Sequence, residues 1–256
     1  MITSFVHSFQ SEWLKKRRSA AVWLVLIGGF LIPVIMLIVR FTNFDRLAVV
    51  NGSDKVWDSL YHGSWRSMGL FLLPMGVILA TSLVTQLEFR NNAWKQLHTT
   101  PQSLSTIFFA KLAVILVMLM QFFILFNVGI YLVGVIPSFF NGVPYPKQSY
   151  TPTLLLKQNY GFIIACLPIV ALQYLLSLQF KNFLLPIGAG LGLLVASLIA
   201  VNWKHGYSIP YTYCSYNFLG AKVVPGGANI MAWSLGYFVV FTGLAYFLYI
   251  KKGEKG

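Results

Sequence analysis

"LAVILVMLMQFFILFNVGIYLVGVI", residues 112–136, contains no charged residue and no histidine. An α-helix rises about 1.5 Å per residue, so a run of this length crosses the hydrocarbon core of a bilayer, which is about 30 Å thick. Five other apolar runs alternate with polar connections along the chain. We therefore predict six transmembrane helices, at about 20–39, 67–86, 112–136, 159–178, 183–201 and 230–250.

The composition agrees with an integral membrane protein. Hydrophobic residues make up 57% of the 256 residues and charged residues only 10%, and the mean hydropathy is +0.70. Soluble domains carry roughly 25% charged residues, and the alternating strands of an outer-membrane barrel are absent from the sequence. We predict an all-α polytopic membrane protein that forms one transmembrane domain over 1–256.

Basic residues predict the orientation of the spans. Eleven of the 19 Lys and Arg residues lie in the N-terminal segment, the connection around 88–112, the short turn at 179–182 and the C-terminal tail. The other eight are spread over longer connections on the opposite side. Short cytoplasmic loops are enriched in Lys and Arg, so both termini are expected in the cytoplasm. The net charge of +13 is then topological, and no nucleic-acid partner is expected.

The N-terminal segment 1–18 has the pattern of an amphipathic helix. Apolar and aromatic residues recur at helical spacing, and a basic cluster follows them. We expect this helix to lie in the membrane interface as an elbow before the first span, with its basic residues toward anionic lipid. The residues assigned to the elbow are Phe5, Phe9, Trp13, Lys15, Lys16, Arg17 and Arg18.

The connection 88–104 is unusually mixed for a membrane protein. Phe89, Ala93 and Leu97 are spaced by four and Trp94 joins them, which predicts a short helix with an apolar stripe. Thr100 before Pro101 reads as an N-cap that starts a second helix running into the third span, and Lys111 is expected to extend to the membrane surface. A solvated topological loop remains an alternative. The stripe favours docking on a cytoplasmic protein.

Two stretches carry a family resemblance. "SEWLKKRRSAAVWLVL" at 11–26 and the pattern between the second and third spans resemble permease subunits of the ABC-2 type, in particular the lantibiotic-immunity and bacitracin-resistance-like branch. The resemblance implies a type V exporter-like transmembrane domain in a bacterial cytoplasmic (inner) membrane. It also implies a coupling segment that contacts an ATP-binding subunit, comprising Glu88, Phe89, Arg90, Asn92, Trp94, Lys95, Leu97 and Pro101.

The chain has no G-x-x-x-x-G-K-[ST] phosphate loop. ATP and Mg are therefore expected on a separate subunit dimer, and no cofactor or metal is expected in this chain. Six spans make half a transporter, so a second permease copy or a paralogous permease is implied. The family resemblance favours export of a hydrophobic or amphipathic molecule, such as an antimicrobial peptide, a lipid-like molecule or a drug.

The sequence also leaves two other functions open. A non-transporting sensor could bind a cation through Asp45, Asp54 and Asp58 of the outer loop 40–66. An intramembrane hydrolase could use Ser64 or His205, but the predicted spans contain almost no acid or base, and we expect no catalytic residue in this chain. Their main polar residues are Gln86, Gln121, Asn127 and Gln173.

Three further features concern the later part of the chain. The outer loop 202–229 is too long for a simple turn, and the resemblance implies re-entrant segments there; its tyrosines, Tyr207, Tyr211, Tyr213 and Tyr216, favour an interfacial belt over the lining of an exit. Cys166 and Cys214 are expected at different membrane depths, without a disulfide or a metal between them. Small residues on the fifth span (Gly188, Gly190, Gly192 and Ala196) allow close helix packing, within the bundle or between subunits.

Overall fold

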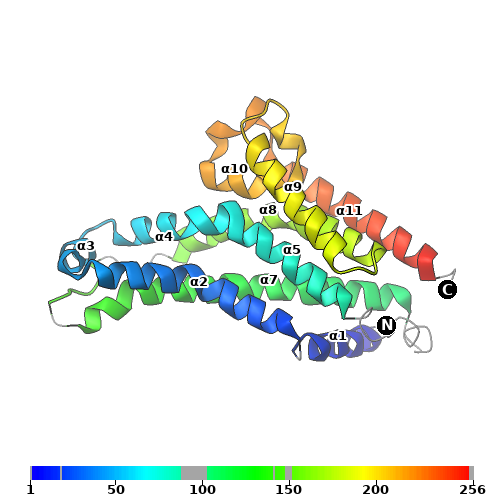
Figure 1. The fold of residues 1–256 in the computed structure, drawn as a ribbon, viewed down its shortest axis with the longest axis horizontal. Helices are drawn as coiled ribbons and strands as arrows, with labels where there is room; N and C mark the ends of the chain where they lie inside the picture. Colours follow the sequence, from blue (N-terminus) through cyan, green and yellow to red (C-terminus); the bar gives the residue numbers. More distant parts are fainter. Residues whose placement is uncertain (1, 18, 88–102, 141, 148–151, 254–256) are drawn as a thin grey trace.

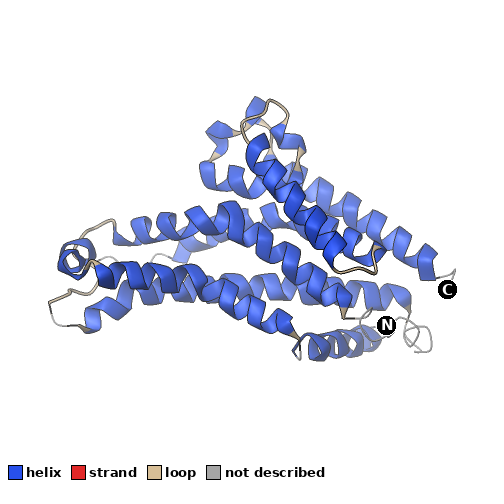
Figure 2. Cartoon of the chain, in the orientation of Figure 1, coloured by secondary structure: helices blue, strands red, loops and turns tan. Residues whose placement is uncertain are grey.

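A computed structural model describes the chain except for residues 1, 18, 88–102, 141, 148–151 and 254–256. The described residues form helices joined by turns, with no strand among them (Figure 2). Inside hydrocarbon a helix bonds all of its own backbone groups, which explains why the apolar runs fold this way. Five helices are long and apolar enough to cross a membrane: Ala20–Thr42, Val56–Gln86, Leu104–Phe139, Gln158–Gln179 and Ile230–Lys252.

The predicted fifth span, 183–201, corresponds to a shorter apolar helix, α9 (Leu184–Ala200). The other main helices are α1 (Ile2–Arg17), α2 (Ala20–Thr42), α4 (Val56–Ser67), α5 (Leu73–Gln86), α7 (Leu104–Val135), α8 (Pro152–Gln179) and α11 (Ile230–Gly253). Four of them, α2, α7, α8 and α11, extend beyond the apolar runs that predicted them.

The segment 40–66, expected as an outer loop, is largely helical. α2 continues to Thr42, a 3-10 turn (Phe44–Arg46) leads into α3 (Leu47–Asn51), and α4 begins at Val56. α4 forms because Trp57, Leu60, Tyr61 and Trp65 recur at helical spacing and are all buried. The ring of Trp65 stacks on Phe162 of α8, with centroids 3.9 Å apart. The expectation of a loop here was wrong.

The second span is interrupted by a π-helical turn, Met68–Leu72, between α4 and α5. Pro74 follows at the start of α5. Proline has no backbone N–H and its ring crowds the preceding turn, so the hydrogen-bond ladder shifts register just before it. Gly69 lies in this turn, where a Cβ atom would come within 2.6 Å of the Phe162 ring. The turn thus allows α8 to approach closely.

The segment 202–229 forms a compact cap between α9 and α11. It comprises 3-10 turns and a short helix, α10 (Tyr213–Leu219), which packs on α8. In Figure 1, α3 and α10 lie toward the left and top of the molecule, while α1 and the end of α11 lie toward the lower right. In this view α1 and the end of α11 thus lie toward the same side of the molecule.

Candidate functional site

All the residues predicted to contact an ATP-binding subunit, from Glu88 to Pro101, lie outside the described residues. Their role stays a prediction. The structure does describe the two helices on either side of them, because α5 ends at Gln86 and α7 begins at Leu104. The contacts of α5 and α7 therefore show which other helices are connected to this segment.

The two ends of the connection are fixed differently. At the end of α5, the Gln86 amide donates a hydrogen bond to the backbone oxygen of Phe180, at 3.3 Å. At the start of α7, Ser103 is extended, and its hydroxyl accepts a hydrogen bond from the Thr106 backbone N–H, at 3.2 Å. Ser103 is thus the N-cap of α7. The expectation of one continuous helix from Pro101 into the third span was wrong, because Ser103 breaks it.

α1 packs along α7 through polar side chains. Its buried residues, Ser8, Glu12 and Lys16, recur every four positions and form one stripe. Lys16 donates a hydrogen bond to Gln121 Oε1 of α7, at 2.9 Å, and its ammonium lies 4.2 Å from the centre of the Trp13 ring. Glu12 binds Lys15 and lies 4.0 Å from Lys111 Nζ of α7. These contacts fasten the N-terminal helix to the third span.

This arrangement corrects two expectations. Lys16 turns toward the protein and is buried, rather than pointing to lipid, and burial lowers the pKa of its ammonium. Lys111 is also buried against α1 and does not extend to the surface. Of the other elbow residues, Phe5, Lys15 and Arg17 are exposed, Phe9 and Trp13 are half-buried, and Arg18 lies outside the described residues. That α1 lies in a membrane interface stays a prediction.

A buried polar network joins α5, α8 and α9. Gln173 of α8 donates to Ser82 Oγ of α5 at 2.9 Å and to the backbone oxygen of Pro186 of α9 at 2.8 Å. Its own oxygen accepts a bond from the Tyr211 hydroxyl, at 3.3 Å. Ser177 lies 3.2 Å from Ser82 across the same interface. Gln173, Ser82, Ser177 and Tyr211 are each at most 1% exposed, so the network is held away from solvent.

Three of the four polar residues expected in the spans link two helices, and Gln86 links α5 to the turn after α8. Gln86, Gln121 and Gln173 make the contacts above, and Asn127 of α7 exchanges two side-chain hydrogen bonds with Asn159 of α8, each 3.1 Å long. Polar side chains between membrane helices commonly serve this purpose. None of these contacts requires a catalytic role.

The cap buries the tyrosines that were expected at an interface. Tyr211, Tyr213 and Tyr216 are each at most 1% exposed. Tyr213 donates to the backbone oxygen of Tyr207 at 2.8 Å, and Tyr216 donates to that of Val201 at 2.9 Å. The interfacial belt was therefore wrong for these three residues. They satisfy buried backbone and side-chain groups and hold the cap on α8 and α9.

The two cysteines also lie together. Cys166 of α8 and Cys214 of α10 are both fully buried, and their Sγ atoms are 3.6 Å apart as free thiols. The expectation of different membrane depths was wrong, because α10 folds back onto α8 instead of staying in an extended loop.

The alternative sites find little support in the described contacts. The Ser64 hydroxyl bonds to the Leu60 backbone oxygen at 2.7 Å and contacts Met36 Sδ, and neither atom is a general base. Asp45, Asp54 and Asp58 are exposed. Within the part of the chain that the structure describes, no group of three or more His, Cys, Asp or Glu could hold a metal ion.

The family model described as "ABC-2 family transporter protein" matches residues 8–197. The match covers more than half of the chain. The chain belongs to the ABC-2 transporter family. No curated protein and no solved structure matches it.

Family membership makes this ABC-2 protein a membrane transport subunit, and its long apolar helices agree with a multi-pass membrane protein. The matched residues run from α1 to α9 and include the connection 88–102. They also contain the α1–α7 contact, and Gln173, Ser82 and Pro186 of the polar network. The cap and α11 lie beyond the match. The helices on both sides of the connection between α5 and α7 thus lie within the matched residues.

Proposed function

We propose that this chain is the membrane-spanning half of an ATP-driven exporter in a bacterial cytoplasmic membrane. A separate ATP-binding subunit dimer, which holds ATP and Mg, supplies the energy, and a second permease copy or a paralogue completes the pathway. Both termini face the cytoplasm in this proposal. Family membership over residues 8–197 is the single observation that carries it.

The connection 88–101 is proposed as the contact with the ATPase. Its sequence has an apolar stripe formed by Phe89, Ala93 and Leu97, with Trp94 beside it, and such stripes dock into grooves on partner proteins. Its flanking helices reach the rest of the molecule. α5 is bonded to α8 and α9 through Ser82 and Gln173, and α7 is bonded to α1 through Lys16 and Gln121. Movement of the connection would thus be transmitted to three other helices, α1, α8 and α9.

A double substitution tests this contact. Trp94→Ala with Leu97→Ala removes two large side chains of the predicted stripe, and we expect recovery of the co-expressed ATPase encoded beside this gene to fall at least about tenfold. Gln96→Ala, on the predicted polar side, is the matched control and should leave recovery unchanged. Equal recovery of the ATPase with all three proteins would reject the coupling assignment.

The face of α9 that points away from the bundle supports a second permease copy. Gly188 and Gly192 are exposed, and a Cβ atom on either would meet no atom within 4 Å. Ala196 continues this spacing of four and is also exposed. Small residues at this spacing let two membrane helices approach closely. By contrast Gly190 is buried against Gln173 and Ile78 inside the bundle.

The oligomeric state tests this face. Gly192→Leu should raise the dissociation constant of the dimer at least about tenfold, or about 1.4 kcal/mol, because the larger side chain separates the helices. Gly243→Leu is the matched control, since Gly243 of α11 is also exposed with open space around its Cβ position. Mass photometry compares the two. A dimer that tolerates Gly192→Leu as well as Gly243→Leu does not use this face.

The cargo is proposed as a hydrophobic or amphipathic molecule, with an antimicrobial peptide as the favoured class. The resemblance of residues 11–26 and 88–111 to permeases of the lantibiotic-immunity branch supports this choice. Cells that express the complete complex should survive a higher concentration of the cognate peptide than cells with the Trp94→Ala and Leu97→Ala protein. Equal survival would remove this substrate class.

A further inference from the structure

Two thiols meet where the cap packs on the membrane helices. Cys166 of α8 and Cys214 of α10 are fully buried, and their Sγ atoms are 3.6 Å apart although the residues lie 48 positions apart in the sequence. They are the two cysteines of the chain. A disulfide bond is about 2.0 Å long, so the sulfur atoms would need to approach by only about 1.5 Å to be joined.

The backbone on both sides of the pair is fixed. α10 approaches α8 closely because Gly161 of α8 has no side chain, and a Cβ atom there would collide with Asn217 of α10. Two residues after Cys214, the Tyr216 hydroxyl donates a hydrogen bond to the Val201 backbone oxygen, at 2.9 Å. The approach of the two sulfur atoms therefore follows from the packing of two helices and not from a loose loop.

The cap is followed directly by a helix that can cross a membrane. This helix, α11, is long and apolar enough to span the bilayer from Ile230 to Lys252. With the C-terminus in the cytoplasm, as in the proposed function, the start of α11 and the cap before it lie on the outer side. Disulfides form and persist outside the cytoplasm and are rare within it.

We propose that Cys166 and Cys214 form a disulfide bond that fixes α10 of the cap to α8. The proposal rests on the orientation given under the proposed function. The structure shows the pair in its reduced form. Both sulfur atoms are buried once the cap has docked, so the bond forms before docking is complete, and burial then shields it from attack by other thiols.

The oxidant is another disulfide, carried by a protein or by a small thiol compound on the outer side of the membrane. The S–S bond of the oxidant breaks and the bond between Cys166 and Cys214 forms. The two thiols of the pair give up two protons and two electrons, which leave with the oxidant as its two new thiols.

The state of the two cysteines in cells tests this bond. The full chain is quenched with acid, free thiols are blocked with N-ethylmaleimide, and cysteines released by later reduction are labelled with iodoacetamide. We expect most chains to carry the iodoacetamide label on both Cys166 and Cys214, and digestion without reduction to give the two peptides as one linked species. N-ethylmaleimide on both cysteines of most chains would overturn the proposal.

Two exposed lysines separate a failure of the bond from a failure of the orientation. In a chain with Cys166→Ala and Cys214→Ala, Lys222→Cys places a thiol on the cap and Lys251→Cys places one at the end of α11. In right-side-out membrane vesicles, a membrane-impermeant maleimide should label the first directly and the second only after detergent is added. With this result, free thiols in the wild-type chain would reject the disulfide and leave the orientation intact. The opposite labelling would reject the orientation itself.

The bond should also stabilise the protein against heat. It links residues 48 positions apart, so the unfolding temperature of the oxidised chain should exceed that of the reduced chain by roughly 5–10 °C. The chain with Cys166→Ala and Cys214→Ala is the control, and a reducing agent should leave its unfolding temperature unchanged. Equal temperatures for the oxidised and reduced wild-type chain would show that the bond does not fix the cap. If the double variant does not fold, alkylation of the wild-type chain still decides whether the bond forms.

Discussion

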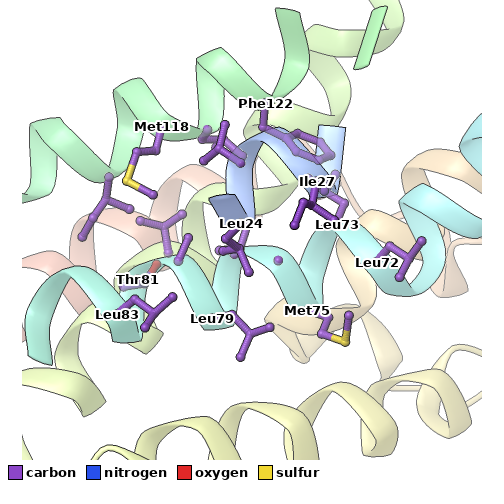
Figure 3. A pocket seen from close by; sticks show the side chains of 18 of the residues that line it. Leu24, Ile27, Leu72, Leu73, Met75, Leu79, Thr81, Leu83, Met118 and Phe122 are labelled. Carbon is purple, nitrogen blue, oxygen red and sulfur yellow. The ribbon is translucent and has the colours of Figure 1, made fainter. Parts of the chain in front are cut away.

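The two sides of α5 hold their hydroxyl groups differently. On the side of α8 and α9, Ser82 accepts a hydrogen bond from Gln173 and lies beside Ser177. The adjacent residue, Thr81, is equally buried but lies beside an apolar cavity of about 350 Å³ between α2, α5 and α7 (Figure 3), and its hydroxyl is without a hydrogen-bond partner in the described part of the chain. Directional bonds therefore fix α5 to α8 and α9, whereas contact with α2 is apolar and does not specify one position.

Among the substitutions that compare the two sides of α5, loss of Gln173 should lower the free energy of unfolding the most. Gln173→Leu removes three hydrogen bonds and leaves the partner groups on Ser82, Pro186 and Tyr211 buried without it. We expect the free energy of unfolding in mixed micelles to fall by about 2–3 kcal/mol. Gln86→Leu is the control, because it loses one bond at an exposed position and should cost about 0.5 kcal/mol or less. Equal losses would show that the buried network adds nothing.

A matched pair of glycines compares the two sides directly. A Cβ atom at Gly190 of α9 would lie 2.5 Å from Gln173 Oε1, so Gly190→Ala should cost about 1–3 kcal/mol. Gly76→Ala adds the same methyl group where a Cβ meets nothing, and it should be neutral or stabilise by up to about 1 kcal/mol. Thermal unfolding of both variants gives the comparison. The contrast would be lost if Gly76→Ala destabilised the protein as much as Gly190→Ala.

Removal of the two neighbouring hydroxyls should have the smallest effects. Ser82→Ala breaks the bond with Gln173 and should cost about 0.5–1.5 kcal/mol. Thr81→Val removes a group that has no bond to lose within the described residues, so it should cost about 0 kcal/mol or stabilise slightly. The same unfolding assay measures both. If Thr81→Val lowered the free energy of unfolding more than Ser82→Ala, the stabilising hydroxyl would be the one on the α2 side of α5, and the comparison would be reversed.

The apolar pattern of the sequence was enough to predict most of the helices. Five of the six predicted spans fall within helices long and apolar enough to cross a membrane, because the length of an apolar run is a local property. The helix at 56–67 was missed because its polar face hid a buried aromatic stripe, Trp57, Leu60, Tyr61 and Trp65, that recurs at helical spacing. Helical periodicity could have revealed it.

The site depended on contacts that no local pattern contains. The 3.6 Å approach of Cys166 and Cys214 and the bond between Tyr211 and Gln173 follow from the folding of the cap onto α8. The burial of Lys16 and Lys111 follows from the packing of α1 along α7. Charge and hydropathy showed where polar residues interrupt the apolar pattern. They did not show which residue each one contacts, because its partner lies far away in the sequence.

We propose that force on the connection 88–101 moves α5 together with α8 and α9, to which Gln173 bonds it, and that α5 then shifts against α2. Spin labels test this most directly in the purified complex with the ATPase, with Cys166 and Cys214 replaced by Ala. One pair joins Leu79 of α5 to Ile27 of α2, and the other joins Leu79 to Leu193 of α9. On ATP binding, the Leu79–Ile27 distance should change by several ångströms while the Leu79–Leu193 distance stays constant. A change confined to the Leu79–Leu193 distance would contradict the account.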